Sequence, residues 1–476
     1  MNAVSALVTA TCIENRTFDE ISLGDSARIT RTLTQRDIEL FSAVSGDMSP
    51  VEMDADYAGT GMLHHLVAHG MWGGSLISAV LGMQLPGPGT IHLAQDLRFY
   101  APIGVGDTID VNVTAVEKDA LRHRIVFHCC VRNQYGVDVI LGKAEVQVPL
   151  KKIRCPHVDL PDVQIADHRR FRAMLSRVAG DSSITVAVVH PCDESSIVAV
   201  KEAAAAGWIE PILVGPAEKI RRVAGQAGVD ISAYRMVDAA HSHAAAQRAV
   251  ALVTSGEAKV LMKGPLHTDE LMHAVVAEPG LHTGRRLSHV YLMDVPSYER
   301  LLLVTDAAIH IAPTLAEKRD IIQNAIDLAY MLDIGAPKVA VLSAVETVNP
   351  AIPSTADSAA LCKMASRGQI EGGVVDGPLA FDNAVSKLAA NEKGIDSAVA
   401  GAADILVVPD LESGNMLAKQ LTFLAGAEAA GIVMGARVPI ILTSRADTSR
   451  ARVTSCAITA LILLAGQARP AAVVES

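Results

Sequence analysis

Hydrophobic and polar positions follow two different rhythms along this chain of 476 residues. In the first part, an apolar segment at 68–83 is long enough for a helix, and runs in which apolar and polar residues alternate come after it. These strand-like runs cover 108–116, 124–131 and 137–148. One helix beside several alternating strands predicts an α+β domain, in which the helix packs against an antiparallel sheet.

The rhythm changes at KKIRCPHVDLPD, residues 151–162, which combines charge, two prolines and no periodicity and is predicted to be a linker. Beyond it, short β-branched runs alternate with alanine-rich helical stretches. This alternation predicts an α/β domain of buried parallel strands, whose following loops we expect to meet at one edge of the sheet and bind ligands there. The predicted strands are 184–189, 211–214, 259–262, 338–342, 404–408 and 439–442. The chain is thus divided into 1–150, the linker, and 163–476.

Composition and charge exclude several classes of function. The net charge is -11, and Lys and Arg are not concentrated anywhere, which argues against a protein that binds nucleic acid. The seven cysteines lack the spacing of a zinc site, so we expect reduced thiols, no metal and no tightly bound cofactor. No apolar run reaches the ~18 residues of a membrane span, and we expect a cytoplasmic protein without a membrane partner.

The first candidate site lies in FSAVSGDMSPVEMDADYA, residues 41–58, where a Gly-Asp pair and a proline turn the chain before the apolar helix. This stretch resembles the hydratase motif of MaoC-like, (R)-specific enoyl-CoA hydratases. The resemblance implies a hot-dog fold, in which an antiparallel sheet wraps a long helix, and catalysis by an aspartate and a histidine. Asp47 matches the aspartate, but Glu52 stands at the histidine position.

Glu52 leaves the function of the first domain open. Two carboxylates that share a proton are a poorer acid-base pair than an aspartate with a histidine. His69, at the helix start, is a candidate substrate-binding residue or a residue that orients the helix. Gly73 and Gly74 suggest close approach of another backbone, as in paired subunits. The domain is therefore either an enoyl-CoA hydratase or a dimerising module that binds acyl-CoA.

Four loops at the ends of predicted strands carry the second candidate site. They are LMKGPLHTDEL at 261–271, VVDGPLAFDNAVS at 374–386, VPDLESGNMLAK at 408–419 and ILTSRADTS at 441–449. Each alone is an ordinary turn or helix cap, but in this order they resemble the phosphate acetyltransferase and phosphate butyryltransferase family. The resemblance implies an α/β domain with two subdomains, similar in scaffold to isocitrate and isopropylmalate dehydrogenases.

The same resemblance implies a reaction that exchanges coenzyme A and inorganic phosphate on a short acyl group. Acyl-CoA and phosphate or acyl phosphate are then the partners, with coenzyme A as a substrate, and a homodimer or higher homo-oligomer is expected. In the family, the pair that matches Ser444 and Arg445 binds substrate and stabilises the transition state. A hydroxyl, a guanidinium and backbone N–H groups that follow a buried strand can converge on phosphate.

The general base of this reaction stays open at the level of sequence. The acetyl branch of the family carries an aspartate at the position of Ala451, so that base is missing here. Asp382 and Glu346 are alternatives. Asp447 is a third, although it is equally a candidate N-cap of the last helix.

Further residues are candidates for binding substrate. Lys263 could supply the charge of an arginine that the acetyl branch has in the same loop, and Arg285 and Arg286 are other cations. Asn415 and Lys419 begin a predicted helix, from which they could reach the cleft or the phosphates of coenzyme A. Three more candidates for substrate binding lie in the turns of the loops at 261–271 and 374–386: Gly264, Asp376 and Gly377.

A metal-dependent NAD(P) dehydrogenase on a similar scaffold is the alternative for the second domain. Neither a GxGxxG motif after a strand nor an acidic cluster for a divalent metal is apparent in the sequence, so the transferase is favoured.

If Glu52 replaces the acid that completes Asp47, the protein should hydrate crotonyl-CoA slowly or not at all. Glu52→His should then raise the rate by ~10²–10⁴, which is what general acid-base catalysis contributes. Loss of the enoyl chromophore measures the rate. Fast hydration by the natural protein would contradict this. It would assign the acid to Glu52 or to His64 or His65, two adjacent histidines close to His69 in the sequence. No gain from histidine would favour the binding module.

Overall fold

The structure is a computed structural model that describes residues 12–48, 67–156, 163, 167–178, 183–444 and 447–468. The chain divides into two compact units, Met1–Ile165 and Ala166–Ser476. Within the expected linker, β7 (Arg154–Pro156) pairs with β1 (Cys12–Glu14) in an antiparallel ladder. Residues 154–156 therefore belong to the first unit and not to the predicted linker, because so short a strand leaves no periodic pattern in the sequence.

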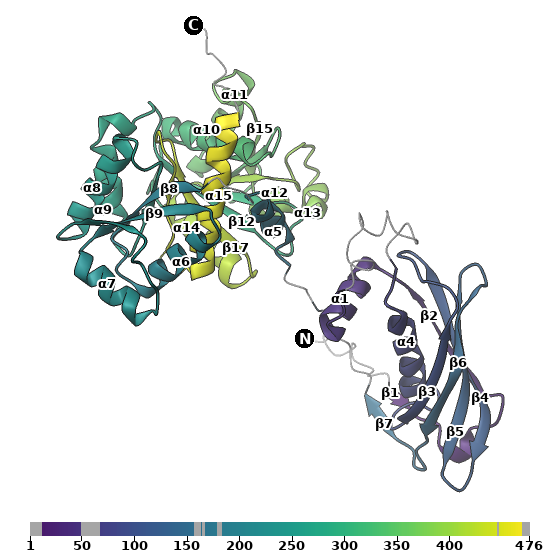
Figure 1. Cartoon of the computed structure of the whole chain (residues 1–476). Coiled ribbons are helices and arrows are strands. Elements are labelled where there is room, and N and C mark those ends of the chain that lie inside the picture. Colours follow the sequence, from purple (N-terminus) through teal and green to yellow (C-terminus); the bar gives the residue numbers. More distant parts are fainter. Residues whose placement is uncertain are drawn as a thin grey trace, which may run out of the picture. The chain divides into compact units, whose positions relative to one another are not determined.

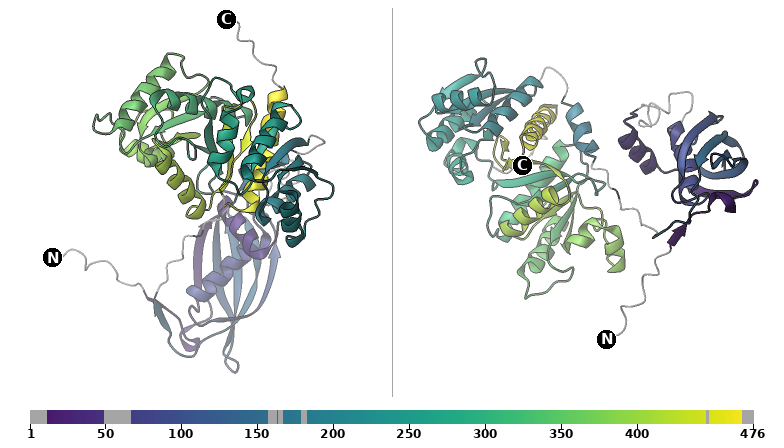
Figure 2. Two further views of the ribbon diagram at one scale, coloured as in Figure 1. Left: turned by 90° about the vertical axis from the view of Figure 1, so that its left-hand side faces the viewer. Right: turned by 90° about the horizontal axis from the view of Figure 1, so that it is seen from below.

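The first unit is a five-stranded antiparallel sheet around one long helix (Figure 1). Its strands, in sheet order, are β2 (Ser26–Thr32), β4 (Thr108–Asp119), β5 (Arg124–Asn133), β6 (Asp138–Gln147) and β3 (Ile91–Phe99). The helix α4 (Gly70–Met83) lies in the curve of this sheet in the views of Figure 2 and buries Trp72, Ile77 and Leu81. The smaller helices are η1 (Phe18–Glu20) and α1 (Gln35–Ser45). This arrangement confirms the predicted hot-dog fold.

Glycines on α4 let the helix approach its own sheet. A Cβ on Gly73 would lie 2.6 Å from Ile140 Cδ1, and one on Gly74 would lie 3.2 Å from Leu97 Cδ1. Both neighbours belong to the same unit. The interpretation of these glycines as contacts with another subunit is therefore wrong, because side chains of β6 and β3 already fill the space beside them.

The second unit is built on one eleven-stranded sheet. Its strands, in sheet order, are β10 (Arg235–Asp238), β9 (Ile209–Gly215), β8 (Ile184–Val189), β11 (Val260–Lys263), β18 (Ile440–Ile441), β17 (Glu428–Met434), β12 (Ser288–Asp294), β13 (Leu302–Thr305), β16 (Ile405–Val407), β14 (Lys338–Leu342) and β15 (Val374–Leu379). Neighbouring strands are parallel except at β18–β17, β17–β12 and β12–β13.

These three antiparallel pairs reverse the strand direction between the two halves of the sheet. The strands from β10 to β18 run one way, and those from β13 to β15 run the other way. The expectation that all strand-end loops leave from one edge is therefore wrong, because the carboxyl ends of the two halves face opposite edges. A pattern of buried runs does not distinguish these directions.

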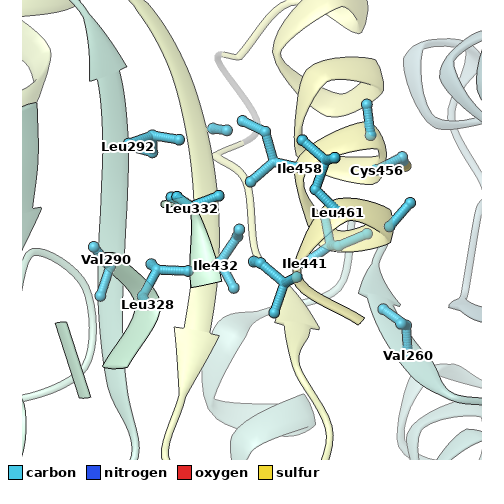
Figure 3. Packing of buried hydrophobic residues seen from close by; sticks show 14 of the residues in the cluster. Val260, Val290, Leu292, Leu328, Leu332, Ile432, Ile441, Cys456, Ile458 and Leu461 are labelled. Atoms are coloured by element: carbon cyan, nitrogen blue, oxygen red, sulfur yellow. The ribbon is translucent and has the colours of Figure 1, made fainter. Parts of the chain in front are cut away.

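Helices cover both faces of this sheet. They are α5 (Arg169–Ser176), α6 (Glu194–Ala205), α7 (Ala217–Gln226), α8 (Ser242–Thr254), α9 (Thr268–Val276), η2 (Pro279–Leu281), α10 (Leu315–Met331), α11 (Pro353–Ser366), α12 (Phe381–Val385), α13 (Lys387–Glu392), α14 (Leu411–Phe423) and α15 (Ser449–Ala468). On one face, Ile441 joins the core cluster that contains Ile458 and Leu461 of α15, as Figure 3 shows. Its neighbours Ile440 and Leu442 belong to the cluster with α8 and α9, because successive strand residues point to opposite faces.

Two kinds of feature are missing from the described ranges. No helix in these ranges is both long enough and apolar enough to cross a bilayer. Nowhere in those ranges do three or more His, Cys, Asp or Glu side chains gather as a metal ion would require.

Close contact at the sheet centre makes Gly431 sensitive to substitution. A Cβ on Gly431 would lie 2.1 Å from the carbonyl oxygen of Leu442 and 2.9 Å from His289 Nε2. We expect Gly431→Ala to destabilise the second unit by ~1–3 kcal/mol, the usual cost of overpacking. Urea unfolding of the full chain measures this.

Gly225 in α7 is the matched control, since a Cβ there meets nothing within 4 Å. Gly225→Ala should stabilise by up to ~1 kcal/mol, because alanine is the better helix former. Equal midpoints for the two variants would contradict the packing argument.

Candidate active site

A cavity of about 710 Å³ in the second unit is lined by residues from both halves of the sheet. Its walls come from the loop after β11, from β12, from the loop after β13, from the start of α14 and from the loop after β18. Three of the four predicted loops meet here, and they contribute Lys263, Asn415 and Ser444. The loop at 374–386 does not line the cavity, because β15 is the outermost strand of its half.

Ser444 is held in a tight turn with Asp447. The Ser444 N–H donates to Asp447 Oδ2 at 2.6 Å, and the Asp447 N–H donates to the Ser444 carbonyl at 3.2 Å. Both residues, with Tyr291, Asn415 and Lys419, also line a small adjoining cavity. Arg445, between them in the chain, lies outside the described residues.

Asp447 has the environment of a tuned carboxyl group. Burial is the largest influence on its pKa and raises it. The hydrogen bond from the Ser444 N–H and the positive charges of Arg452 and Lys263 lower the pKa and offset part of this rise. The first turn of α15 is capped by a different residue, since Thr448 Oγ1 accepts from the Ala451 N–H at 3.2 Å. The N-cap interpretation of Asp447 is therefore wrong, and its carboxylate serves the Ser444 turn.

Lys263 is the last residue of β11, and Gly264 follows it. The lysine is buried, at 4% exposure, yet it lines the large cavity, and its Nζ donates to the Gly264 carbonyl at 3.2 Å. A Cβ on Gly264 would lie 2.5 Å from the Val189 carbonyl oxygen. Glycine is thus required for the close passage of this loop beside β8.

Helix α14 supplies the opposite wall. Asp410 caps it by accepting from the Ser413 N–H at 2.8 Å and from the Ser413 hydroxyl at 2.7 Å. Asn415 Nδ2 donates to the Ala307 carbonyl at 3.4 Å, which ties the helix to the loop after β13. Lys419, one turn further on, is exposed beside the small cavity.

Four other predicted residues lie away from the cavity lining. Lys393 Nζ is 3.3 Å from Glu346 Oε2 and 3.2 Å from Asp382 Oδ2, so these carboxylates belong to a separate ionic cluster. The Asn383 N–H and Lys393 hold the pKa of Asp382 below its usual range, unlike a base poised near neutrality. The other two are Asp376, whose Oδ1 accepts the Gly377 N–H at 2.8 Å, and Gly377 itself.

Arg285 and Arg286 are also remote from the large cavity. Arg285 forms an ion pair with Asp327, and Arg286 Nε lies 3.8 Å from Glu317 Oε1. Both line a different cavity of about 380 Å³. The sequence showed their charge, but the acidic partners come from α10, which the sequence does not place beside them.

Sequence reasoning missed residues that shape the cavity floor. Tyr291 lines it, and burial raises the pKa of its hydroxyl, so it remains a neutral hydrogen-bonding group. Buried Asp306 accepts from the backbone N–H of Ala308 and from His310 Nδ1, at 3.0 and 2.6 Å, and so fixes the loop that puts Ala308 in the wall. An aspartate two residues after the apolar run LLLV was the available signal.

In the first unit, the structure brings His69 to Asp47. His69 Nε2 lies 3.1 Å from the Asp47 carbonyl oxygen and 3.3 Å from Ser42 Oγ, and the ring is buried at the N-cap of α4. A cavity of about 290 Å³ opens beside Gly70, the first residue of that helix. Glu52 lies outside the described residues. His69 thus joins the Asp47 segment to the helix start.

Known proteins match both parts of the chain. The Phosphate acetyl/butaryl transferase family matches residues 243–460, and the MaoC like domain family matches residues 23–132. A phosphate acetyltransferase of Rhizobium meliloti is 58% identical over 297 residues, which is 62% of this chain and 94% of that protein. The chain belongs to the phosphate acetyl/butaryl transferase family.

Further comparisons agree with this membership. A phosphate butyryltransferase of Clostridium acetobutylicum is 40% identical over 295 residues, 62% of this chain and 98% of that protein. The crystal structure of a branched-chain phosphotransacylase from Enterococcus faecalis V583 matches with 32% identity and a TM-score of 0.52, over 58% of this chain and 99% of that one. Both resemblances read from the sequence, and the α/β fold of the second unit, are confirmed.

In this family member, Asp447 should oppose folding at neutral pH. The pKa of Asp447 is higher in the folded state than in the unfolded state. The protein therefore loses stability as the pH rises through these two pKa values, because the folded state resists ionisation of this carboxyl group. Asp447→Asn keeps an acceptor for the Ser444 N–H. It should therefore be more stable than the natural protein near pH 7, and the gain should vanish at acidic pH. Urea midpoints across pH measure this.

Asp382→Asn is the control of opposite sign. The lowered pKa of Asp382, set first by the Asn383 N–H, means that its ionised form stabilises the fold and that this contribution is lost on acidification. Loss of stability near pH 7 in both variants would contradict the assignment for Asp447.

Proposed function

We propose that the second unit transfers a short acyl group reversibly between coenzyme A and inorganic phosphate. The observation that carries this is the meeting of Lys263, Asn415 and Ser444, from three separate loops, around one cavity. Relatives named phosphate acetyltransferase and phosphate butyryltransferase, which this chain covers almost completely, support the same reaction.

The chemistry needs charge stabilisation more than covalent catalysis. In one direction a phosphate oxygen attacks the thioester carbonyl, the C–S bond breaks, and coenzyme A leaves as a thiolate that takes up a proton. Ser444, Arg445 and Lys263 supply a hydroxyl and two cations for the phosphate and for the oxyanion of the tetrahedral intermediate. Asn415 positions the bound substrate from α14, and Lys419 contacts a phosphate of coenzyme A.

Asp447 is the proton acceptor in the reverse direction. It removes the proton of the coenzyme A thiol, the thiolate attacks the carbonyl of the acyl phosphate, and phosphate leaves. A carboxyl group whose pKa is raised by burial is suited to this proton transfer, because its pKa is closer to neutral pH. The proposed mechanism gives no role to Asp382, Glu346, Asp376, Gly377, Arg285 or Arg286, which are not among the residues that line the cavity.

For the first unit we propose acyl-CoA binding, with enoyl-CoA hydration as the alternative activity. The cavity at the start of α4 supports binding, since backbone N–H groups at a helix start can hold a thioester oxygen. A homo-oligomer is supported by the edge strand β3, on which Ile91 and Phe99 are 60% and 50% exposed. We place the protein in the cytoplasm, where coenzyme A substrates are available.

Thiol release from acetyl-CoA or butyryl-CoA should require phosphate. Ser444→Ala should lower kcat by ~10²–10³, the effect of losing one donor to a transition-state oxyanion. A thiol reagent and a phosphate titration measure both. Ser449→Ala, at the start of α15 and outside the cavity lining, is the control and should leave kcat unchanged. Release that is independent of phosphate would refute the reaction, and normal kcat in Ser444→Ala would remove Ser444 from it.

A further inference from the structure

A buried arginine lies beneath the cavity and takes no part in the reaction as described so far. Among the residues that the structure describes, Arg452 is the largest fully buried side chain, with 1% exposure. It lies near the start of α15, in the helix that packs under β18. Burying a guanidinium is costly unless its donors are satisfied, so their targets indicate what the residue does.

Two donors of Arg452 reach the loop that holds Ser444. Nη1 donates to Thr443 Oγ1 at 3.0 Å, and Nη2 donates to the Ser444 carbonyl at 3.1 Å. Within the described ranges Arg452 forms no ion pair, and its Nε has no hydrogen-bond partner. The charge is therefore not cancelled by a carboxylate in direct contact, and both observed bonds fix two consecutive residues of the cavity wall.

The same charge acts on Asp447 at the other end of this turn. Burial raises the pKa of Asp447, and the Ser444 N–H and then Arg452 counter that rise. The other groups that face this carboxyl are Lys263 from β11, His289 and Tyr291 from β12 and, across the small cavity, Lys419 from α14. His289 is buried, and burial lowers its pKa, which leaves Lys263 and Arg452 as the buried cations near Asp447 and Lys419 as an exposed one.

We propose that Arg452 is a positioning residue of the acyltransferase site. It holds the Thr443–Ser444 loop from below in the geometry that binds phosphate, and it supplies a fixed positive charge beside Asp447. The planar guanidinium suits this task because it reaches two oxygen atoms at once, whereas a lysine ammonium is a single point charge on a flexible stem. The inference rests on the proposed reaction for its kinetic readouts.

The test compares Arg452→Lys and Arg452→Met with the natural full chain. Arg450→Met is the matched control, because Arg450 lies on the same helix, is exposed, and pairs with Glu428 at 2.6 Å. Measured are kcat, the KM for phosphate and for acyl-CoA, the pH dependence of kcat, urea stability, and binding of inorganic phosphate by calorimetry.

Arg452→Lys should fold and should lower kcat/KM for phosphate by about 10²-fold, the scale of a small misplacement of a reacting group. The KM for acyl-CoA should change little, since the bonds are to the Ser444 loop. Arg452→Met removes a cation beside a carboxylate, which raises the pKa of Asp447. In the direction that forms acyl-CoA from acyl phosphate and coenzyme A, where Asp447 acts as the base, the acid limb of the kcat profile should therefore move to higher pH. Arg450→Met should change none of these.

Unchanged kinetics and an unchanged acid limb in Arg452→Lys and in folded Arg452→Met would overturn the proposal and leave Arg452 a packing residue. If Arg452→Met does not fold, the result for Arg452→Lys is sufficient: normal kcat/KM and normal phosphate binding in that variant overturn the proposal. Failure of the proposed reaction is separate: it shows as no phosphate-dependent thiol release in the natural protein. In that case weaker phosphate binding by Arg452→Lys still supports the positioning role, and equal binding overturns it.

Discussion

The antiparallel pairing of β12 with β17 is the constraint on which the second unit depends. Seven residue pairs, from Ser288 with Met434 to Asp294 with Glu428, join two sets of parallel strands that run in opposite directions. This pairing brings the loop after β18 and the helix after β16 to the same cavity, although they lie in different halves of the sheet. Val290 of β12 pairs with Thr305 and with Ile432, and Ile432 pairs with Ile441, so the ends of β13 and β18 lie in the same row of the sheet although the two strands run in opposite directions.

Close backbone contact at this junction forms the floor of the site. Gly431 carries no side chain, so the Leu442 carbonyl can approach it, and the Leu442 N–H donates to the Gly431 carbonyl at 3.0 Å. His289 Nε2 lies 3.0 Å from the same Leu442 carbonyl. Burial lowers the pKa of His289, which favours a neutral ring that donates through Nε2. The contacts of Leu442 with Gly431 and His289 therefore set the position of Thr443 and Ser444, which follow it in the chain.

Charge below and beside that floor gives the site its chemistry. Lys263 and Arg452 are both almost fully buried. Lys263 donates to the Gly264 carbonyl, and Arg452 donates to the carbonyl of Ser444, which lines the cavity. Buried cations that satisfy their donors in this way keep a strong field, because little water screens them. A phosphate dianion entering the cavity would meet that field, and Asp447 is the carboxyl group placed to respond to it.

The sequence by itself predicted several strands, the two families and three residues that line one cavity. Strands 184–189 and 338–342 have the predicted bounds, since apolar β-branched runs are typical of buried strands wherever they lie. Lys263, Asn415 and Ser444 were identified because their motifs occur in a recognisable order along the chain. Local pattern and motif order are properties of neighbouring residues, and both can be read without a fold.

Tertiary structure decided the rest. The place of β14 and β15 at the outer end of the sheet separates Glu346 and Asp382 from the cavity, and the position of α10 pairs Arg285 with Asp327. Only packing shows that Asp447 faces Ser444 while Thr448 caps α15, and that Arg452 turns inward while Arg450 on the same helix faces solvent. The reason is physical: burial and long-range contacts set which of several similar polar residues meets the substrate, and segments far apart in the chain supply those contacts.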